Sequence, residues 1–79
     1  MLVRIEHIEP HPDFSIDITF SDGIKKHVLF KPFIGNDQLS RPLNDYTYFS
    51  KVSVYENGRG IYWPNDFDFC PDYLHDFVQ

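Results

Sequence analysis

A short stretch of strictly alternating residues constrains the fold of this chain more than any other feature. Its apolar members are Phe14, Ile16, Ile18 and Phe20, and small or polar residues stand between them. Because successive side chains of a strand point to opposite faces, this period of two predicts a half-buried β-strand. Asp22-Gly23 follows directly, a pair typical of the turn of a β-hairpin.

The register of that hairpin depends on the length of its loop. A two-residue loop would place Phe20 opposite Lys25 and would mix apolar and charged side chains on one face. A three-residue loop with Gly23 in the left-handed region instead pairs Ile16 with Val28 and keeps the apolar face continuous. We therefore predict the three-residue loop.

The flanking segments predict a strand before this hairpin and a loop after it. Residues 2–8 have the composition of a strand, which Pro10 and Pro12 are expected to end. Residues 32–43 combine glycine, asparagine, aspartate and proline, which is typical of a loop.

Two helices are predicted, one central and one C-terminal. Asn44 or Asp45 can cap a short helix over residues 46–50, with Phe49 as its buried residue. Cys70-Pro71-Asp72 has the pattern of a helix start, because proline fits the first helical position and aspartate favours the positive end of the helix dipole. The residues expected to face the sheet from this second helix are Tyr73, Leu74, Phe77 and Val78.

A second hairpin completes the expected architecture. It consists of a strand through residues 52–54, a turn at Asn57-Gly58 and a return strand at residues 60–63, after which Pro64 is expected to stop pairing. The fold class is therefore α+β: a small antiparallel sheet of about five strands in hairpins, one short helix, and a C-terminal helix packed on the sheet. At 79 residues, we expect a single domain over residues 1–79.

Composition narrows the classes of function. No apolar run exceeds a few residues, which argues against a transmembrane helix or a signal peptide. Cys70 is the only cysteine, so no internal disulfide can form and we expect a cytoplasmic protein. The net charge of −5 argues against non-specific binding to phosphate backbones.

The acidic excess is concentrated in the second half of the chain. Residues 42–79 hold two basic and six acidic groups, whereas residues 1–41 hold five and six. The acidic candidates near the C-terminus are Asp66, Asp68, Asp72 and Asp76. Two interpretations are open: a solvated face that keeps the protein soluble, or a docking edge for a basic protein partner.

Aromatic residues are unusually dense, with eight Phe, five Tyr and one Trp. These rings are more numerous than a small core can bury, so we expect some of them at the surface. The candidates for a contact surface are Tyr46, Tyr48, Tyr55 and Tyr62. Partial burial around a flat sheet is the alternative, and a homodimer would be one way to cover exposed rings.

Catalytic and metal chemistry find little support in the pattern. Cys70 precedes a helix, but His75 stands about 140° away around that helix, so we expect Cys70 to be a small buried residue rather than a nucleophile. Asp72, His75 and Asp76 share one helix face without the spacing of a known metal motif. His7 and His11 stand four apart, but Pro10 excludes the helix that would align them. We predict no enzyme, cofactor or metal.

The basic residues form one loose cluster, which consists of Lys25, Lys26, Lys31 and Arg41. It could contact nucleic acid, although the surrounding acidic groups dilute it. The alternative is that these lysines protect a strand edge from pairing with another chain.

Four motifs in order resemble the small bacterial family called domain of unknown function 2442. They are Phe20-Ser21-Asp22-Gly23, Phe49 leading to Val52 and Val54, Trp63-Pro64-Asn65, and Cys70-Pro71-Asp72. The resemblance covers nearly the whole chain, and the segment from Trp63 to Asp72 is its specific part. This chain has Asp66 where the family usually has glycine, a residue that tolerates positive φ more readily than aspartate.

The resemblance implies a small α+β domain without attached catalytic residues. It also implies that the gene lies beside a gene for another small protein, in an arrangement similar to that of toxin–antitoxin pairs. Trp63, Pro64, Cys70 and Pro71 are then packing and chain-reversal residues. We therefore predict a protein-interaction module, antitoxin-like or regulatory. The alternatives are a nucleic-acid-binding regulatory domain and a small metal-binding or thiol enzyme.

Overall fold

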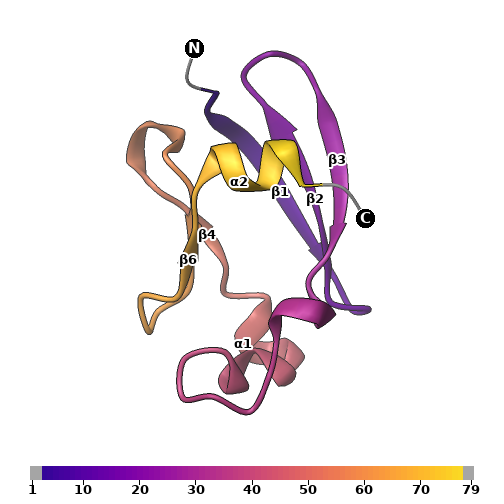
Figure 1. The fold of residues 1–79 in the computed structure, drawn as a ribbon, viewed down its shortest axis with the longest axis vertical. Helices are drawn as coiled ribbons and strands as arrows, with labels where there is room; N and C mark the ends of the chain where they lie inside the picture. The colour runs from indigo at the N-terminus through magenta and orange to yellow at the C-terminus, as the bar shows by residue number, and fades with distance from the viewer. Residues whose placement is uncertain (1–2, 78–79) are drawn as a thin grey trace.

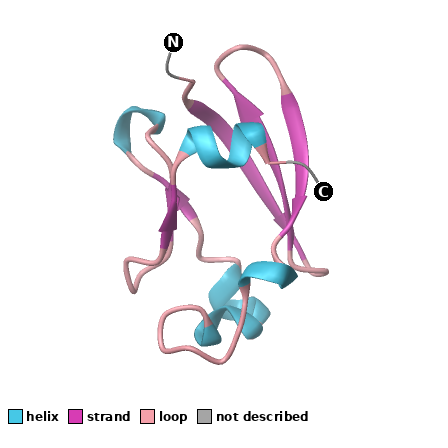
Figure 2. Cartoon of the chain, in the orientation of Figure 1, coloured by secondary structure: helices cyan, strands magenta, loops and turns pink. Residues whose placement is uncertain are grey.

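The computed structural model, which describes residues 3–77, consists of two three-stranded antiparallel sheets bridged by a helix (Figures 1 and 2). The first sheet has the order β1 (Ile5–His11), β2 (Ser15–Phe20), β3 (Lys25–Leu29). The second has the order β4 (Ser53–Val54), β5 (Ile61–Tyr62), β6 (Asp68–Phe69). The α+β class is confirmed, but six strands in two sheets replace the single sheet of about five.

The predicted register of the first hairpin is confirmed. Ile16 pairs with Val28, and the Phe20 amide donates to the Ile24 carbonyl at 2.9 Å across a three-residue loop. Gly23 closes this loop with φ +88°, a conformation that glycine adopts without a Cβ clash. The buried apolar residues of β2, which are Ile16, Ile18 and Phe20, therefore all point to one side.

β1 extends further than predicted. It continues through Pro10 to His11 instead of ending near residue 8, so this expectation was wrong. β1 lies at the edge of its sheet, and the Pro10 carbonyl accepts from the Tyr46 hydroxyl at 3.5 Å rather than from β2. Because the nitrogen and carbonyl of one strand residue point to the same side, the missing N–H of Pro10 faces away from the ladder and removes no hydrogen bond.

The segment predicted as a loop contains two turns of 3-10 helix, η1 (Lys31–Phe33) and η2 (Arg41–Asn44). A proline lies in the first turn of each. Between them the Asp37 carboxylate accepts from the amides of Leu39 at 3.1 Å and Ser40 at 2.9 Å. Local side-chain hydrogen bonds thus order a composition that predicted irregular structure.

The central helix is confirmed as α1 (Tyr46–Phe49). Its N-cap is Asp45, whose carboxylate accepts from the Thr47 amide at 3.1 Å. Phe49 is fully buried, as the sequence predicts. The helix and the two 3-10 turns close one end of the molecule (Figure 1).

The second hairpin is confirmed, and a third strand follows it. β4 pairs with β5 around the turn η3 (Glu56–Gly58), in which Asn57 has φ +72°. The chain then reverses between Trp63 and Phe67, with Asp66 at φ +70°, and β6 pairs with β5. Pro64 therefore interrupts pairing without ending it, and a two-residue strand such as β6 is too short to show a period.

The C-terminal helix is confirmed as α2 (Pro71–Asp76), with Cys70 as its N-cap. Leu74 is buried, whereas Tyr73 is 48% exposed. The expectation that Tyr73 faces the sheet was therefore wrong, since so short a helix turns only one side chain fully inward. Val78 lies outside the described residues. The Lys26 ammonium donates to the carbonyls of His75 and of Phe77, the latter at 3.0 Å, and so holds the end of α2 against β3.

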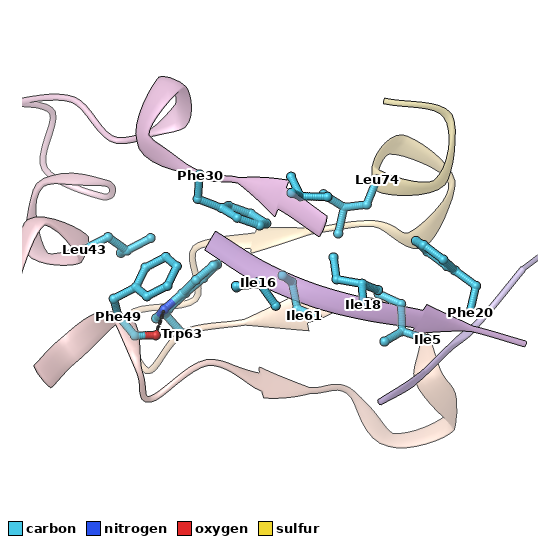
Figure 3. Packing of buried hydrophobic residues seen from close by; sticks show 11 residues of the cluster. Ile5, Ile16, Ile18, Phe20, Phe30, Leu43, Phe49, Ile61, Trp63 and Leu74 are labelled. Atoms are coloured by element: carbon cyan, nitrogen blue, oxygen red, sulfur yellow. Dashed lines mark hydrogen bonds between the residues drawn. The ribbon is translucent and has the colours of Figure 1, made fainter. Parts of the chain in front are cut away.

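The core lies between the two sheets and α2 (Figure 3). Trp63 and Phe49 are both fully buried there, and the Trp63 indole donates to the Phe49 carbonyl at 2.9 Å. This bond connects the second sheet to α1. Within residues 3–77, no helix has the length and apolar character needed to cross a membrane.

Candidate functional site

Four aromatic rings from three elements gather beside α2. They are Phe33 of η1, Phe69 of β6, Tyr73 of α2 and Phe77 at the C-cap of α2. Ring centroids lie 5.1 Å apart for Phe33 and Phe69, 5.1 Å for Phe33 and Phe77, and 5.8 Å for Tyr73 and Phe77. Tyr73 is exposed and the other three rings are partly buried. We call these four residues the ring face.

The ring face follows from the short length of α2. Tyr73 and Phe77 stand four residues apart and therefore share one side of the helix, while Leu74 points into the core. The rings of Phe33 and Phe69 lie 6.1 Å and 6.2 Å from that of Tyr73, and they lead inward to the buried ring of Phe30. An apolar path thus runs from the core to solvent.

Carboxylates border the ring face. Asp72 and Asp76 are exposed, and with Tyr73 and Phe77 they line a shallow open depression. On its other side Asp72 shares a second depression with Arg4 and Arg59. The ring face is therefore apolar at its centre and acidic along the helix.

Two of the four predicted surface tyrosines have structural roles. The Tyr46 hydroxyl donates to the Pro10 carbonyl, and its ring meets Phe14 edge-on at 6.1 Å. The Tyr48 hydroxyl accepts from the Asn65 amide at 3.0 Å. Both side chains are partly buried, which favours the packing interpretation for this pair.

The other two predicted tyrosines form a separate patch on the second sheet. Tyr55 and Tyr62 stack at 4.4 Å, and the Tyr55 hydroxyl donates to the Asp68 carboxylate at 2.9 Å. This hydrogen bond holds the Tyr55 proton and raises the pKa of Tyr55. Asp68 pairs with Tyr62, and their neighbours Ile61 and Phe69 point to the core, so this patch lies on the opposite side of the sheet. The predicted surface residues therefore do not form one site.

The alternative of thiol chemistry at Cys70 and His75 gains no geometric support. Cys70 is exposed, so the expectation of a buried residue was wrong; the N-cap lies between β6 and α2, outside the helical turn that packs on the core. Both ring nitrogens of His75 lie against carboxylates, Nε2 2.8 Å from Asp22 and Nδ1 3.3 Å from Asp76. These hydrogen bonds, that of Asp22 foremost, raise the pKa of His75.

The predicted basic cluster is partly engaged in the fold. Lys26 caps α2, as described above, and the Lys31 ammonium lies 4.7 Å from the centre of the Phe14 ring. Lys25 is exposed on the edge strand β3, a position suited to protection of that edge.

One cluster was not predicted. His11 of β1, Asp17 of β2 and His27 of β3 meet on the solvent side of the first sheet, and each imidazole contacts one oxygen of the Asp17 carboxylate. His11 Nε2 lies 2.8 Å from Oδ2, and His27 Nδ1 lies 2.5 Å from Oδ1. These contacts, that of His27 foremost, lower the pKa of Asp17, and the Asp17 hydrogen bond raises the pKa of His11. The predicted register already pairs Asp17 with His27. His11 was missed because the first strand was predicted to end near residue 8.

The sequence pattern of one family, described as "Protein of unknown function (DUF2442)", matches residues 5–78. The chain belongs to this family. No curated protein and no solved structure matches the chain. The matched range includes the Trp63–Asp72 segment, and the family description assigns no activity to any residue.

Proposed function

We propose that this DUF2442 member is a non-enzymatic interaction module that binds a basic protein partner through the ring face. The observation that carries the proposal is the exposure of Tyr73, at 48%, on top of three partly buried rings and beside the carboxylates of Asp72 and Asp76. Aromatic anchors of this kind dominate the energetics of protein interfaces.

The chemistry of the ring face defines the partner. A matching surface would insert apolar side chains against Tyr73 and Phe77 and place Lys or Arg beside Asp72 and Asp76. The net charge of −5 would favour encounter with such a basic surface. The family resemblance suggests a small basic protein encoded nearby, in an antitoxin-like or regulatory relationship within the cytoplasm.

The test is a calorimetric titration of the purified chain with the protein product of the neighbouring gene. We expect one-to-one binding that weakens with salt, and a loss of at least tenfold in affinity for Tyr73→Ala, since hot-spot truncations cost about 2 kcal/mol or more. Leu39→Ala is the matched control, because Leu39 is also an exposed apolar residue, at 52%, and lies outside the ring face.

Three outcomes would overturn the proposal. The first is absence of binding at micromolar concentrations. The second is equal affinity for the Tyr73→Ala and Leu39→Ala variants. The third is a wild-type homodimer in sedimentation that Tyr73→Ala converts to a monomer, because a second copy of the chain would then cover the ring face.

A further inference from the structure

Two imidazoles and a carboxylate from three adjacent strands converge on the solvent side of the first sheet. One ligand atom from each of His11, Asp17 and His27 can be chosen such that all three lie within 4.8 Å of one another. Small rotations of these side chains would bring the three ligand atoms to the separation of about 3.4 Å found around a tetrahedral ion. The cluster shares no residue with the ring face or with the acidic groups beside it.

Strand register explains the convergence. Asp17 occupies the central strand and pairs directly with His27 of β3, so both side chains point to the same face. His11 pairs with Ser15, two residues along β2, and reaches Asp17 diagonally. All three residues lie within hydrogen-bonded strands, so the backbone fixes their positions before any ligand arrives.

The surroundings of the cluster favour a cation. Glu9 pairs with Asp17 from β1 and therefore lies on the same face. The Asp13 carboxylate, held by the Ser15 amide at 3.1 Å and by its hydroxyl at 2.5 Å, adds negative charge near His11. Lys25, two residues from His27, is the basic residue of β3 on the same face as His27, whereas the adjacent Lys26 lies on the opposite face and caps α2.

We propose that His11, Asp17 and His27 bind one divalent transition-metal ion, with Zn²⁺ as the preferred ion. Imidazole nitrogen together with one carboxylate oxygen is a donor set suited to Zn²⁺ and its neighbours, and poorly suited to Ca²⁺ or Mg²⁺. The ion replaces the protons that the imidazoles share with Asp17, and these protons leave to solvent. Water completes the coordination, because Asp17 and His27 are exposed.

The bound ion joins all three strands of the first sheet. β1 is an edge strand, and its end at His11 would be linked through the ion to both β2 and β3. Binding to the folded chain alone raises its stability by mass action. The ion therefore has a structural role in this proposal.

The test titrates Zn²⁺ into the tag-free full chain, with competition against a chromophoric chelator to measure affinity. We expect one ion per chain with a dissociation constant in the micromolar range or below, and a higher melting temperature with Zn²⁺. Imidazole resonances of His11 and His27 should shift in NMR spectra. His11→Gln and His27→Gln should each lower the affinity for Zn²⁺ at least tenfold. Loss of a residue that only supports a ligand already costs about tenfold or more, and these substitutions remove a ligand itself.

His7→Gln is the matched control, because His7 lies on the same strand and the same face as His11 but outside the cluster. Circular dichroism without metal establishes that each variant is folded. The proposal fails if the chain binds no Zn²⁺ at millimolar concentration. It also fails if His7→Gln weakens binding as much as His11→Gln, or if a folded variant lacking both His11 and His27 keeps the wild-type affinity.

Discussion

The indole nitrogen of Trp63 donates a hydrogen bond to the main-chain carbonyl of Phe49 at 2.9 Å, and both residues are fully buried (Figure 3). The bond joins the end of β5 to the end of α1, two segments that share no strand ladder. It also explains why tryptophan rather than another large apolar residue suits this position, since only tryptophan combines this volume with a ring donor.

Trp63→Phe should lower the free energy of unfolding by about 2–4 kcal/mol. The change leaves the buried Phe49 carbonyl without its donor and opens space in the core. Urea denaturation measures this loss, and we expect the slope of unfolding free energy against urea concentration to stay unchanged. Leu39→Ala on the surface is the control. A loss below about 1 kcal/mol would show that the hydrogen bond and the volume of the indole add little to stability.

Gly58→Ala should destabilise the chain more than Gly23→Ala. Both glycines have positive φ, +70° and +88°, so both substitutions carry a similar backbone strain. A Cβ at Gly58 would lie 2.5 Å from the Ile5 carbonyl oxygen, whereas a Cβ at Gly23 meets no atom within 4 Å. We expect a difference of about 1–3 kcal/mol in the free energy of unfolding, typical of overpacking. Equal losses would mean that β1 shifts freely away from the turn.

We expect backbone strain at Asp66, which substitution by glycine would relieve. With φ +70° it occupies the left-handed region at the chain reversal before β6. Asp66→Gly should raise the free energy of unfolding by up to about 1 kcal/mol, and Asp66→Val should lower it by about 1–2 kcal/mol. Thermal or urea denaturation of both variants checks the prediction. The opposite order of stability would contradict the assigned conformation.

The contact between His75 and Asp22 should make stability depend on pH. The Asp22 hydrogen bond, assisted by Asp76, raises the pKa of His75 above its ordinary 6.5, so this contribution is complete below that pH and is lost as pH rises through the raised value. The Ile24 amide and then His75 lower the pKa of Asp22 below 3.8, so its contribution is present above that pH and is lost as pH falls through the lowered value.

The resulting window of greatest stabilisation lies between these two ordinary values. We therefore expect the stability difference between wild type and His75→Gln to be larger at pH 6 than at pH 9. Urea denaturation at both values measures it, with His7→Gln as the control for a histidine elsewhere on the surface. An identical difference at both pH values would mean that the ion pair does not contribute.

The sequence predicted those parts of the fold that local chemistry specifies. The register at Gly23 followed from the alternation of β2, and residue type alone limited the cap of α1 to Asn44 or Asp45, of which Asp45 is the cap. The end of β1 was missed because the tolerance of Pro10 depends on its place at a sheet edge, which no local pattern encodes. β6 was missed because two residues show no period.

The candidate surfaces were harder to predict, because they depend on tertiary placement. Tyr46 and Tyr48 are engaged by Pro10 and Asn65, residues distant in sequence. The exposure of Tyr73 follows from the limited length of α2, and helical spacing alone suggested the reverse. The His11 cluster required three strands to be aligned at once, beyond any single motif.

Lys26 gives α2 a second attachment, because the helix begins directly after β6 and its final carbonyls accept from this β3 side chain. Movement of either sheet would therefore displace Tyr73 and Phe77. The ring face forms only while both sheets keep their native positions. A partner that recognises it would therefore bind only the fully folded domain. Partial unfolding at either end would abolish recognition before the chain as a whole lost its structure.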